Sequence, residues 1–127
     1  STDMLQVSLW TLEDLWPDAC VKTAEDGDSA WHLLAQWTPD LLVTDLRMPG
    51  LNGLELCRRV QSERALGRTK ILVITADAGL RARWRVFDHG AAECLIKPFS
   101  ADELRSSAVR LVSPPVRTLQ VMKGDSL

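Results

Sequence analysis

Three polar residues of different chemistry close three apolar segments of the sequence. Asp45 ends "LLVTD" (41–45), Thr75 ends "KILVIT" (70–75), and Lys97 follows "ECLI". A carboxylate can act as a nucleophile and form an acyl phosphate. The negative charge on the phosphoryl oxygens must then be met by a cation and by hydrogen-bond donors. Lys97 and Thr75 have these two properties, so the question is whether the fold brings all three residues together.

The elements that would position them alternate along the chain. Apolar segments too short for helices predict strands over 19–24, 41–45, 70–75 and "ECLIKP". Helical spacing of apolar residues predicts helices between and around these strands. The markers are Leu5, Leu9, Leu12 and Trp16; Ala30, Leu33, Leu34 and Trp37 after a cap at Asp28 or Ser29; Leu54, Cys57 and Val60; "LRARWRVFDHG"; and "SADELRSSAVRLV", where Ser100 and Glu103 have capping-box spacing.

This alternation determines where the polar residues should meet. Strands that alternate with helices across short turns form a parallel sheet covered by helices on both faces. In such sheets the functional crevice lies beyond the carboxyl ends of the strands. Asp45, Thr75 and Lys97 all fall at those ends, so we expect one site that contains a carboxylate, a hydroxyl and an ammonium group.

Composition excludes several function classes. The 127 residues suit one domain, and a net charge of −2 gives no electrostatic reason to expect direct binding to nucleic acid. No apolar run is long enough to cross a membrane. The three cysteines lie far apart without metal-ligand spacing, which favours buried thiols in a reducing cytoplasm.

Four segments, in order, resemble the receiver domain of response regulators from bacterial two-component systems. "PDLLVTDLRMPGLNGLEL" is similar to the phosphoacceptor segment of that family, "ILVITA" to its fourth strand, "GAAECLIKPFSADEL" to its fifth strand and last helix, and "AEDGDSAWHLL" to the stretch after its second strand. The resemblance covers roughly residues 3 to 112. It implies a flavodoxin-like, doubly wound α/β fold and a receiver domain over 1–112, followed by a linker or extra strand over 113–127.

The resemblance also implies roles for individual residues. Asp45 would accept a phosphoryl group from a histidine kinase or phosphotransfer protein, and Thr75 would be the switch hydroxyl. Lys97 would pair with the phosphoryl oxygens, and its bond to Pro98 would be cis. Mg²⁺ would be held by Asp45 and by the backbone carbonyl of Arg47. Phosphorylation would change the surface around the fourth helix, fifth strand and fifth helix, where an output domain or effector protein would bind.

The sequence departs from the family pattern at the first strand. Receivers open with a central strand that ends in an acidic pair, which an ungapped count places just before and at Ser1. Deleting a central strand would leave a slot about 9.6 Å wide whose backbone groups are unpaired. "TLQVM" (118–122) resembles the missing strand and is one candidate to fill the slot, within one chain or by exchange in a homodimer, with Asp125 restoring some acidity. The alternative is that 113–127 is a linker.

Two further functions remain open. Cys94 stands where receivers usually carry an aromatic switch residue, so a degenerate receiver that works as a phosphorylation-independent docking or dimerisation module is the main alternative. A phosphatase with an aspartate nucleophile usually has a second aspartate two residues later, and that position is Arg47. We therefore expect a switch module that is not an enzyme, with weakened or lost Mg²⁺ binding.

Overall fold

The protein folds around a five-stranded parallel sheet with strand order β1-β5-β2-β3-β4. The structure is a computed structural model that describes residues 2–45, 53–76 and 93–122. In chain order the elements are α1 (Thr2–Leu15), β1 (Cys20–Ala24), α2 (Gly27–Gln36), β2 (Leu41–Asp45), α3 (Gly53–Ser62), the 3₁₀ turn η1 (Arg64–Leu66), β3 (Lys70–Thr75), β4 (Glu93–Ile96), α5 (Ala101–Leu111) and β5 (Thr118–Met122). The predicted doubly wound α/β fold is confirmed.

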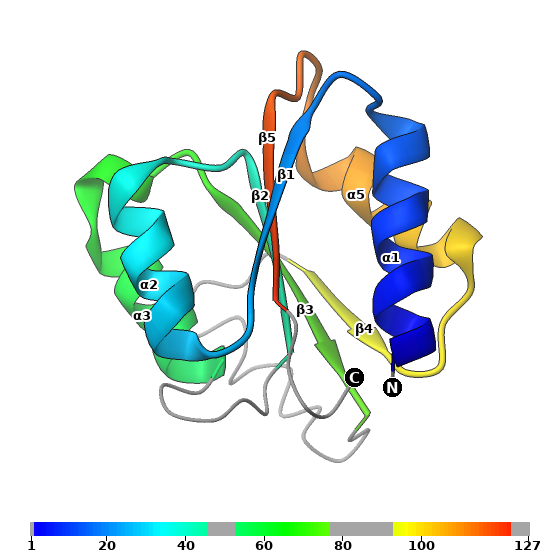
Figure 1. The fold of residues 1–127 in the computed structure, drawn as a ribbon, viewed down its shortest axis with the longest axis horizontal. Coiled ribbons are helices and arrows are strands. Elements are labelled where there is room, and N and C mark those ends of the chain that lie inside the picture. Colours follow the sequence, from blue (N-terminus) through cyan, green and yellow to red (C-terminus); the bar gives the residue numbers. More distant parts are fainter. Residues whose placement is uncertain (1, 46–52, 77–92, 123–127) are drawn as a thin grey trace.

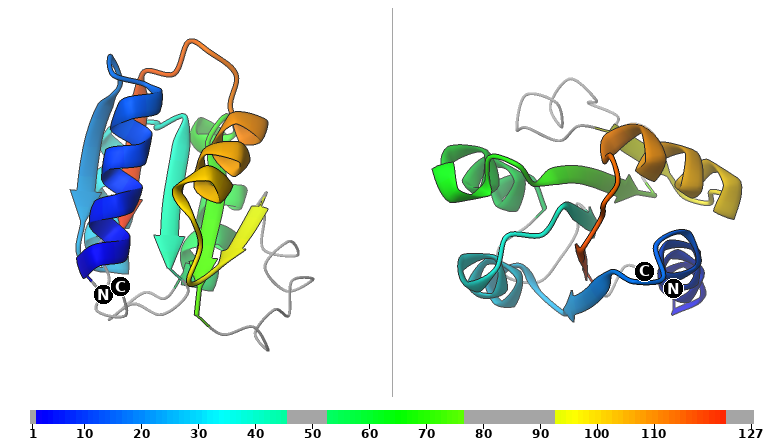
Figure 2. Two further views of the ribbon diagram at one scale, coloured as in Figure 1. Left: turned by 90° about the vertical axis from the view of Figure 1, so that its right-hand side faces the viewer. Right: turned by 90° about the horizontal axis from the view of Figure 1, so that it is seen from above.

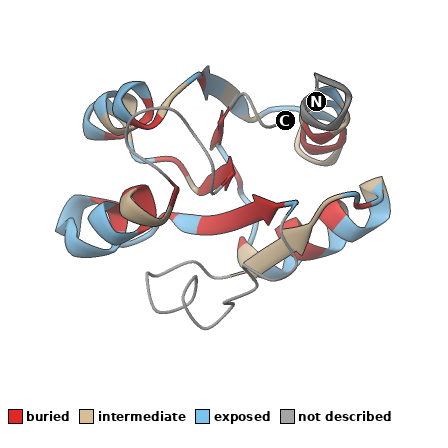
Figure 3. Cartoon of the chain, turned by 90° about the horizontal axis from the view of Figure 1, so that it is seen from below, coloured by how far each residue is buried: buried red, intermediate tan, exposed pale blue. Residues whose placement is uncertain are grey.

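Helices cover both faces of the sheet, as Figure 1 shows with α2 and α3 on one side and α1 and α5 on the other. Each face has its own apolar cluster, one beneath α2 and α3 and the other beneath α1 and α5. The view from above in Figure 2 separates these layers. Figure 3 shows buried residues concentrated on the strands and on the inward sides of the helices. The strands of β2 and β3 are therefore apolar on both faces, as buried parallel strands must be.

The central slot of the sheet is filled by β5 (Figure 1). This strand pairs in parallel with β1 from Cys20↔Thr118 to Ala24↔Met122, and with β2 from Leu41↔Leu119 to Val43↔Val121. The prediction that residues 118–122 enter the sheet between the strands at 20–24 and 41–45 is thus confirmed within one chain, and the alternative that all of 113–127 is a linker is wrong for these residues. Filling the slot pairs the backbone edges of β1 and β2, which would otherwise be buried without partners.

Local signals explain where two helices begin. Ser100 and Glu103 form the predicted capping box at the start of α5, with reciprocal side-chain to backbone hydrogen bonds. The predicted cap of α2 at Asp28 or Ser29 is wrong. Asp26 has extended backbone angles, and its carboxylate accepts a hydrogen bond from the Ser29 amide at 2.7 Å, so the helix starts earlier.

Candidate functional site

The three residues that the sequence selects for chemistry lie at neighbouring carboxyl ends of the sheet. Asp45 is the last residue of β2, and Thr75 is the last residue of β3, next to it in the sheet. Lys97 directly follows β4, and its backbone amide donates to the carbonyl of Thr75 at 2.8 Å. That bond extends the β3–β4 pairing by one step and holds the start of the Lys97 side chain at the same edge as Asp45.

Asp45 and Lys97 form an ion pair. The ammonium Nζ of Lys97 donates to Oδ2 of Asp45 at 2.5 Å. Only 3% of the Asp45 side chain and 9% of the Lys97 side chain are exposed to solvent. Removing both charges from water is costly, and the close pairing offsets that cost. A charged pair is therefore held together at the edge of an apolar sheet, where an incoming anion can compete with Asp45 for the ammonium.

Thr75 ends β3, the strand next to β2, at the same carboxyl edge of the sheet. Its residue is only 2% exposed, and the hydrogen bond from Lys97 fixes its backbone against β4. A hydroxyl can donate to a phosphoryl oxygen and can rotate without moving the backbone. The neighbouring Thr44 turns its hydroxyl to the backbone carbonyl of Asp45 at 3.0 Å. The structure thus places Asp45, Thr75 and Lys97 at one edge of the sheet, and their roles in chemistry stay a prediction.

Several other predicted features can be placed or set aside. The Lys97–Pro98 bond is cis, as the resemblance implies. Cys94 is half-buried in β4 and packs against the cluster beneath α2 and α3. Arg47, Asp125 and the predicted helix "LRARWRVFDHG" lie outside the described residues.

The described residues do not by themselves make a magnesium site. Mg²⁺ in proteins is bound through one or two carboxylates together with substrate oxygens and water. Asp45 is the carboxylate that ends β2 at this edge, and it is already paired with Lys97. Glu25 and Asp26 follow β1 at the same edge, and the Asp26 carboxylate caps α2. Within the described ranges, no group of three or more His, Cys, Asp or Glu side chains is arranged to hold a metal ion.

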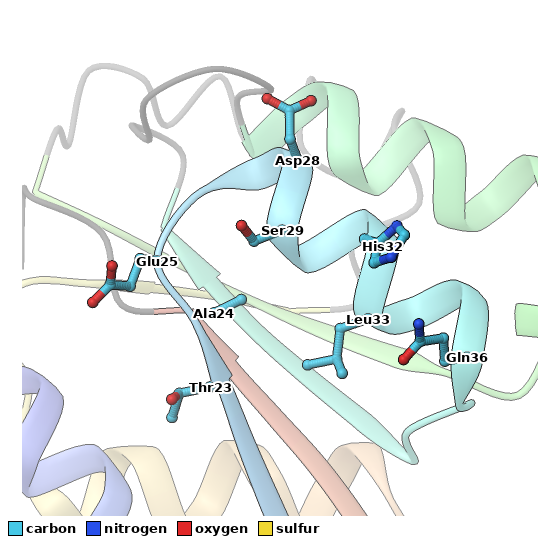
Figure 4. A pocket seen from close by; sticks show the side chains of 8 residues that line it. All are labelled: Thr23, Ala24, Glu25, Asp28, Ser29, His32, Leu33 and Gln36. Atoms are coloured by element: carbon cyan, nitrogen blue, oxygen red, sulfur yellow. The ribbon is translucent and has the colours of Figure 1, made fainter.

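A separate groove of about 750 Å³ lies between the carboxyl end of β1 and the outer side of α2. Figure 4 shows the residues that line it, namely Thr23, Ala24, Glu25, Asp28, Ser29, His32, Leu33 and Gln36. None of Asp45, Thr75 and Lys97 lines this groove. The groove is therefore separate from the site at the edge of the sheet. His32, which lines the groove, is exposed on α2.

Comparison with known proteins decides what kind of domain carries this site. The family model of the response regulator receiver domain matches residues 2–109. The chain belongs to that family. The receiver domain match ends before β5, the strand that completes the sheet.

Curated relatives place similar receiver domains in larger signalling proteins. The chain is 35% identical over 108 residues to the phosphate regulon transcriptional regulatory protein PhoB of Rhizobium meliloti, covering 83% of this chain and 48% of PhoB. It is 35% identical over 110 residues to the sensor histidine kinase TmoS of Ectopseudomonas mendocina, covering 87% of this chain and 11% of that kinase. The chain thus spans about half of one relative and about a tenth of the other.

Solved structures agree with the fold. The signal receiver domain of a DNA-binding response regulator from Colwellia psychrerythraea has a TM-score of 0.78 and 27% identity, with 87% of this chain and 90% of that chain covered. The receiver domain of the sensor histidine kinase PA1611 from Pseudomonas aeruginosa has a TM-score of 0.75 and 25% identity, with 87% and 89% covered. That second structure has a magnesium ion coordinated in its active-site cleft.

No helix within the described part of the receiver domain is long and apolar enough to cross a bilayer.

Sequence reasoning missed two residues that hold the central strand. The carboxylate of Asp40 accepts hydrogen bonds from the backbone amides of Arg117 and Thr118 at 2.8 and 3.0 Å. The buried side-chain amide of Gln120 accepts a hydrogen bond from the indole of Trp37, the residue that directly follows α2. Both contacts join residues that are far apart in the sequence, so no local spacing indicates them.

Proposed function

We propose that this receiver domain is a phosphorylation switch in which Asp45 accepts a phosphoryl group from a histidine kinase or a phosphotransfer protein. The observation that carries the proposal is the buried Asp45–Lys97 pair, with Thr75 next to it at the carboxyl edge of the sheet. In an ordinary turn, an aspartate would have neither a buried cation nor a hydroxyl aligned with it. These three groups match the needs of an acyl phosphate and its charge.

The transfer step forms one bond and breaks one. A carboxylate oxygen of Asp45 attacks the phosphorus of a phosphohistidine, the new P–O bond forms, and the P–N bond breaks. The imidazole leaves with the electron pair of that bond and takes a proton from water. Since Asp45 is held at the edge and only 3% of its side chain is exposed, its attacking oxygen is positioned with little freedom.

Lys97 has different partners before and after transfer. Before transfer its ammonium pairs with Oδ2 of Asp45. Formation of the acyl phosphate removes the negative charge of that carboxyl group and places charge on the phosphoryl oxygens. The ammonium then pairs with those oxygens, so the cation is retained while its partner changes.

Thr75 provides the readout of this change. A phosphoryl group on Asp45 offers acceptor oxygens to the hydroxyl of Thr75 on the adjacent strand. Movement of Thr75 toward them would shift the end of β4, because the backbone carbonyl of Thr75 accepts a hydrogen bond from the amide of Lys97, which directly follows β4. We propose that the surface around β4 and α5 then changes its affinity for an output domain or effector protein, with no turnover of a substrate.

In this proposal Mg²⁺ has one role, as an ion that Asp45 and the phosphoryl oxygens would bind. When bound, the ion would neutralise charge on the phosphoryl group. Of the two ligands that the resemblance implies, Asp45 and the Arg47 carbonyl, Asp45 is the one within the described residues, so we expect weaker binding than a site with two or more carboxylate ligands would give.

A degenerate receiver that docks without phosphorylation is the second candidate. Cys94 in β4 supports it, because a small apolar side chain cannot swing inward as an aromatic residue would. In that case the ion pair between Asp45 and Lys97 would only stabilise the fold. The partner would bind the domain without phosphorylation.

Intact mass measurement separates the two candidates. The protein is incubated with Mg²⁺ and acetyl phosphate, and the mass of one phosphoryl group should be added. Asp45→Asn should abolish the addition, whereas Asp18→Asn, at an exposed turn aspartate, should leave it unchanged. Circular dichroism of each variant confirms that the fold is kept. If the wild-type protein gains no mass that depends on Asp45, the switch function is wrong and the docking function stands.

A further inference from the structure

The strand β5 lies in a slot between β1 and β2 and pairs with both of them. On one side it pairs with β1 over five residues, and on the other with β2 over three. Its residues Leu119, Gln120, Val121 and Met122 are each 0–1% exposed. The segment that leads to it is largely exposed at Ser113, Pro114 and Pro115. The strand is therefore deeply bound, while residues 113–115 of its tether are exposed.

The entrance of the slot fixes where the strand begins. Asp40 stands just before β2, and its carboxylate accepts from the amides of Arg117 and Thr118. Its own amide donates to the carbonyl of Thr118 at 2.8 Å. From the other side, the amide of Cys20 donates to the carbonyl of Arg117 at 2.8 Å. The backbone of the entering strand is thus held by both neighbours at its first residue.

In the middle of the slot, the side chain of Gln120 makes specific hydrogen bonds. Oε1 of Gln120 accepts from the indole Nε1 of Trp37 at 3.0 Å, and its Nε2 donates to the carbonyl of Ala30 at 3.3 Å. Trp37 is in turn covered by Lys22, whose Nζ lies 4.5 Å from the ring centroid. Lys22 and Gln120 are register partners in β1 and β5, and both contact Trp37. The contacts with Trp37 therefore depend on the register between the two strands.

A shifted strand would lose this match. A shift by one residue turns every side chain to the opposite face. Gln120 would then face the apolar cluster beneath α1 and α5, which now takes Leu119 and Val121. A buried amide without partners is strongly disfavoured, and the Trp37 indole would lose its acceptor as well.

We propose that the slot between β1 and β2 is a sequence-selective binding site for an extended peptide, with Gln at the third position of Thr-Leu-Gln-Val-Met as its main determinant. The segment 118–122 is the ligand that the chain carries, and the same peptide binds in trans when that segment is disabled. This inference concerns the sheet and stands independently of phosphorylation at Asp45.

The first experiment uses full-length Val121→Asp, which places a charge in the apolar cluster and disables β5. A capped, fluorescent peptide of residues 116–122 should bind this host, measured by anisotropy. A peptide in which Leu replaces the Gln should bind about tenfold more weakly or worse. Full-length Val109→Asp, altered at an exposed position of α5, keeps its own strand and should bind neither peptide.

Two results would overturn the proposal. One is equal or tighter binding of the Leu peptide, and the other is no binding of the wild-type peptide to the Val121→Asp host. Should that host be unfolded alone, the wild-type peptide must restore its circular dichroism spectrum, and failure to do so counts against the proposal equally.

A double-mutant cycle tests the determinant without any added peptide. Trp37→Phe and Gln120→Leu are made singly and together in the full chain, and urea unfolding is measured. Coupling should change the folding equilibrium constant by about fivefold or more. The matched cycle of Trp31→Phe, within α2, and Gln120→Leu should be additive. Additivity in the Trp37 cycle would show that Gln120 is not selected through Trp37.

Discussion

The carboxylate of Asp45 is paired with the buried ammonium group of Lys97, and the strength of this pairing can be measured. Removing either member of the pair leaves the other charge buried without that partner, which is costly, whereas removing both restores balance. We expect Asp45→Asn and Lys97→Met to be coupled by about 1–3 kcal/mol in a urea-unfolding double-mutant cycle. Additive effects would show that Lys97 does not stabilise Asp45. Arg105 and Asp102, an exposed pair on α5, provide a control cycle with coupling below about 1 kcal/mol.

The buried thiol of Cys57 predicts a distinct pH dependence. Burial raises the pKa of Cys57 from 9.0 to about 12. Because the folded state keeps the proton that the unfolded state releases, this contribution to stability is complete below pH 9 and is lost as pH rises toward 12. In that pH range the wild type should lose stability more steeply than Cys57→Ala, measured by urea unfolding.

The same pKa predicts the order of thiol reactivity. At pH 8 iodoacetamide should modify the exposed Cys20 in the folded protein and leave Cys57 unmodified until denaturant is added. Peptide mass mapping identifies the labelled residue. Labelling of Cys57 at the rate of Cys20 in the folded protein would contradict its burial.

Among the elements, α5 depends on its capping box. Ser100→Ala removes the acceptor for the Glu103 amide and should lower the free energy of unfolding by about 1 kcal/mol. Ser106→Ala, at an exposed position inside the same helix, should be neutral or slightly stabilising, because alanine is the better helix former. Equal losses in the two variants, measured by thermal unfolding, would mean that the cap does not limit the stability of α5.

The elements were largely predictable because their signals are local. Periodic apolar residues gave α1, α3 and α5 and the strands β2 and β3, and the capping box marked the start of α5. Alternation of strands and helices then placed Asp45, Thr75 and Lys97 at one edge. The start of α2 was missed because three acceptors, Asp26, Asp28 and Ser29, compete within four residues. The roles of Asp40 and Gln120 depend on contacts across 78 and 83 positions, which no local pattern reveals.

For the whole molecule, the position of β5 predicts a new covalent link. Cys20 and Thr118 are register partners in adjacent parallel strands, which are about 4.8 Å apart and within the range of a disulfide. Thr118→Cys should therefore form a disulfide with Cys20 under mild oxidation, detected by peptide mapping. Ser106→Cys, on the exposed side of α5, should not.

The same cross-link distinguishes one chain from two. A monomeric product on non-reducing gels means that each chain fills its own slot, as the structure has it. A covalent dimer means that β5 is exchanged between copies. No disulfide at all would contradict the strand order β1-β5-β2.

The place of β5 also sets a timetable for folding during synthesis. Although β5 lies inside the sheet, it is translated after the other four strands, β1 to β4. Until Met122 has been added, β1 and β2 have exposed inner edges that are open to pairing with other chains. Contacts across such long sequence separations also form slowly. A nascent chain of this protein therefore needs protection by chaperones for longer than one whose central strand is made first.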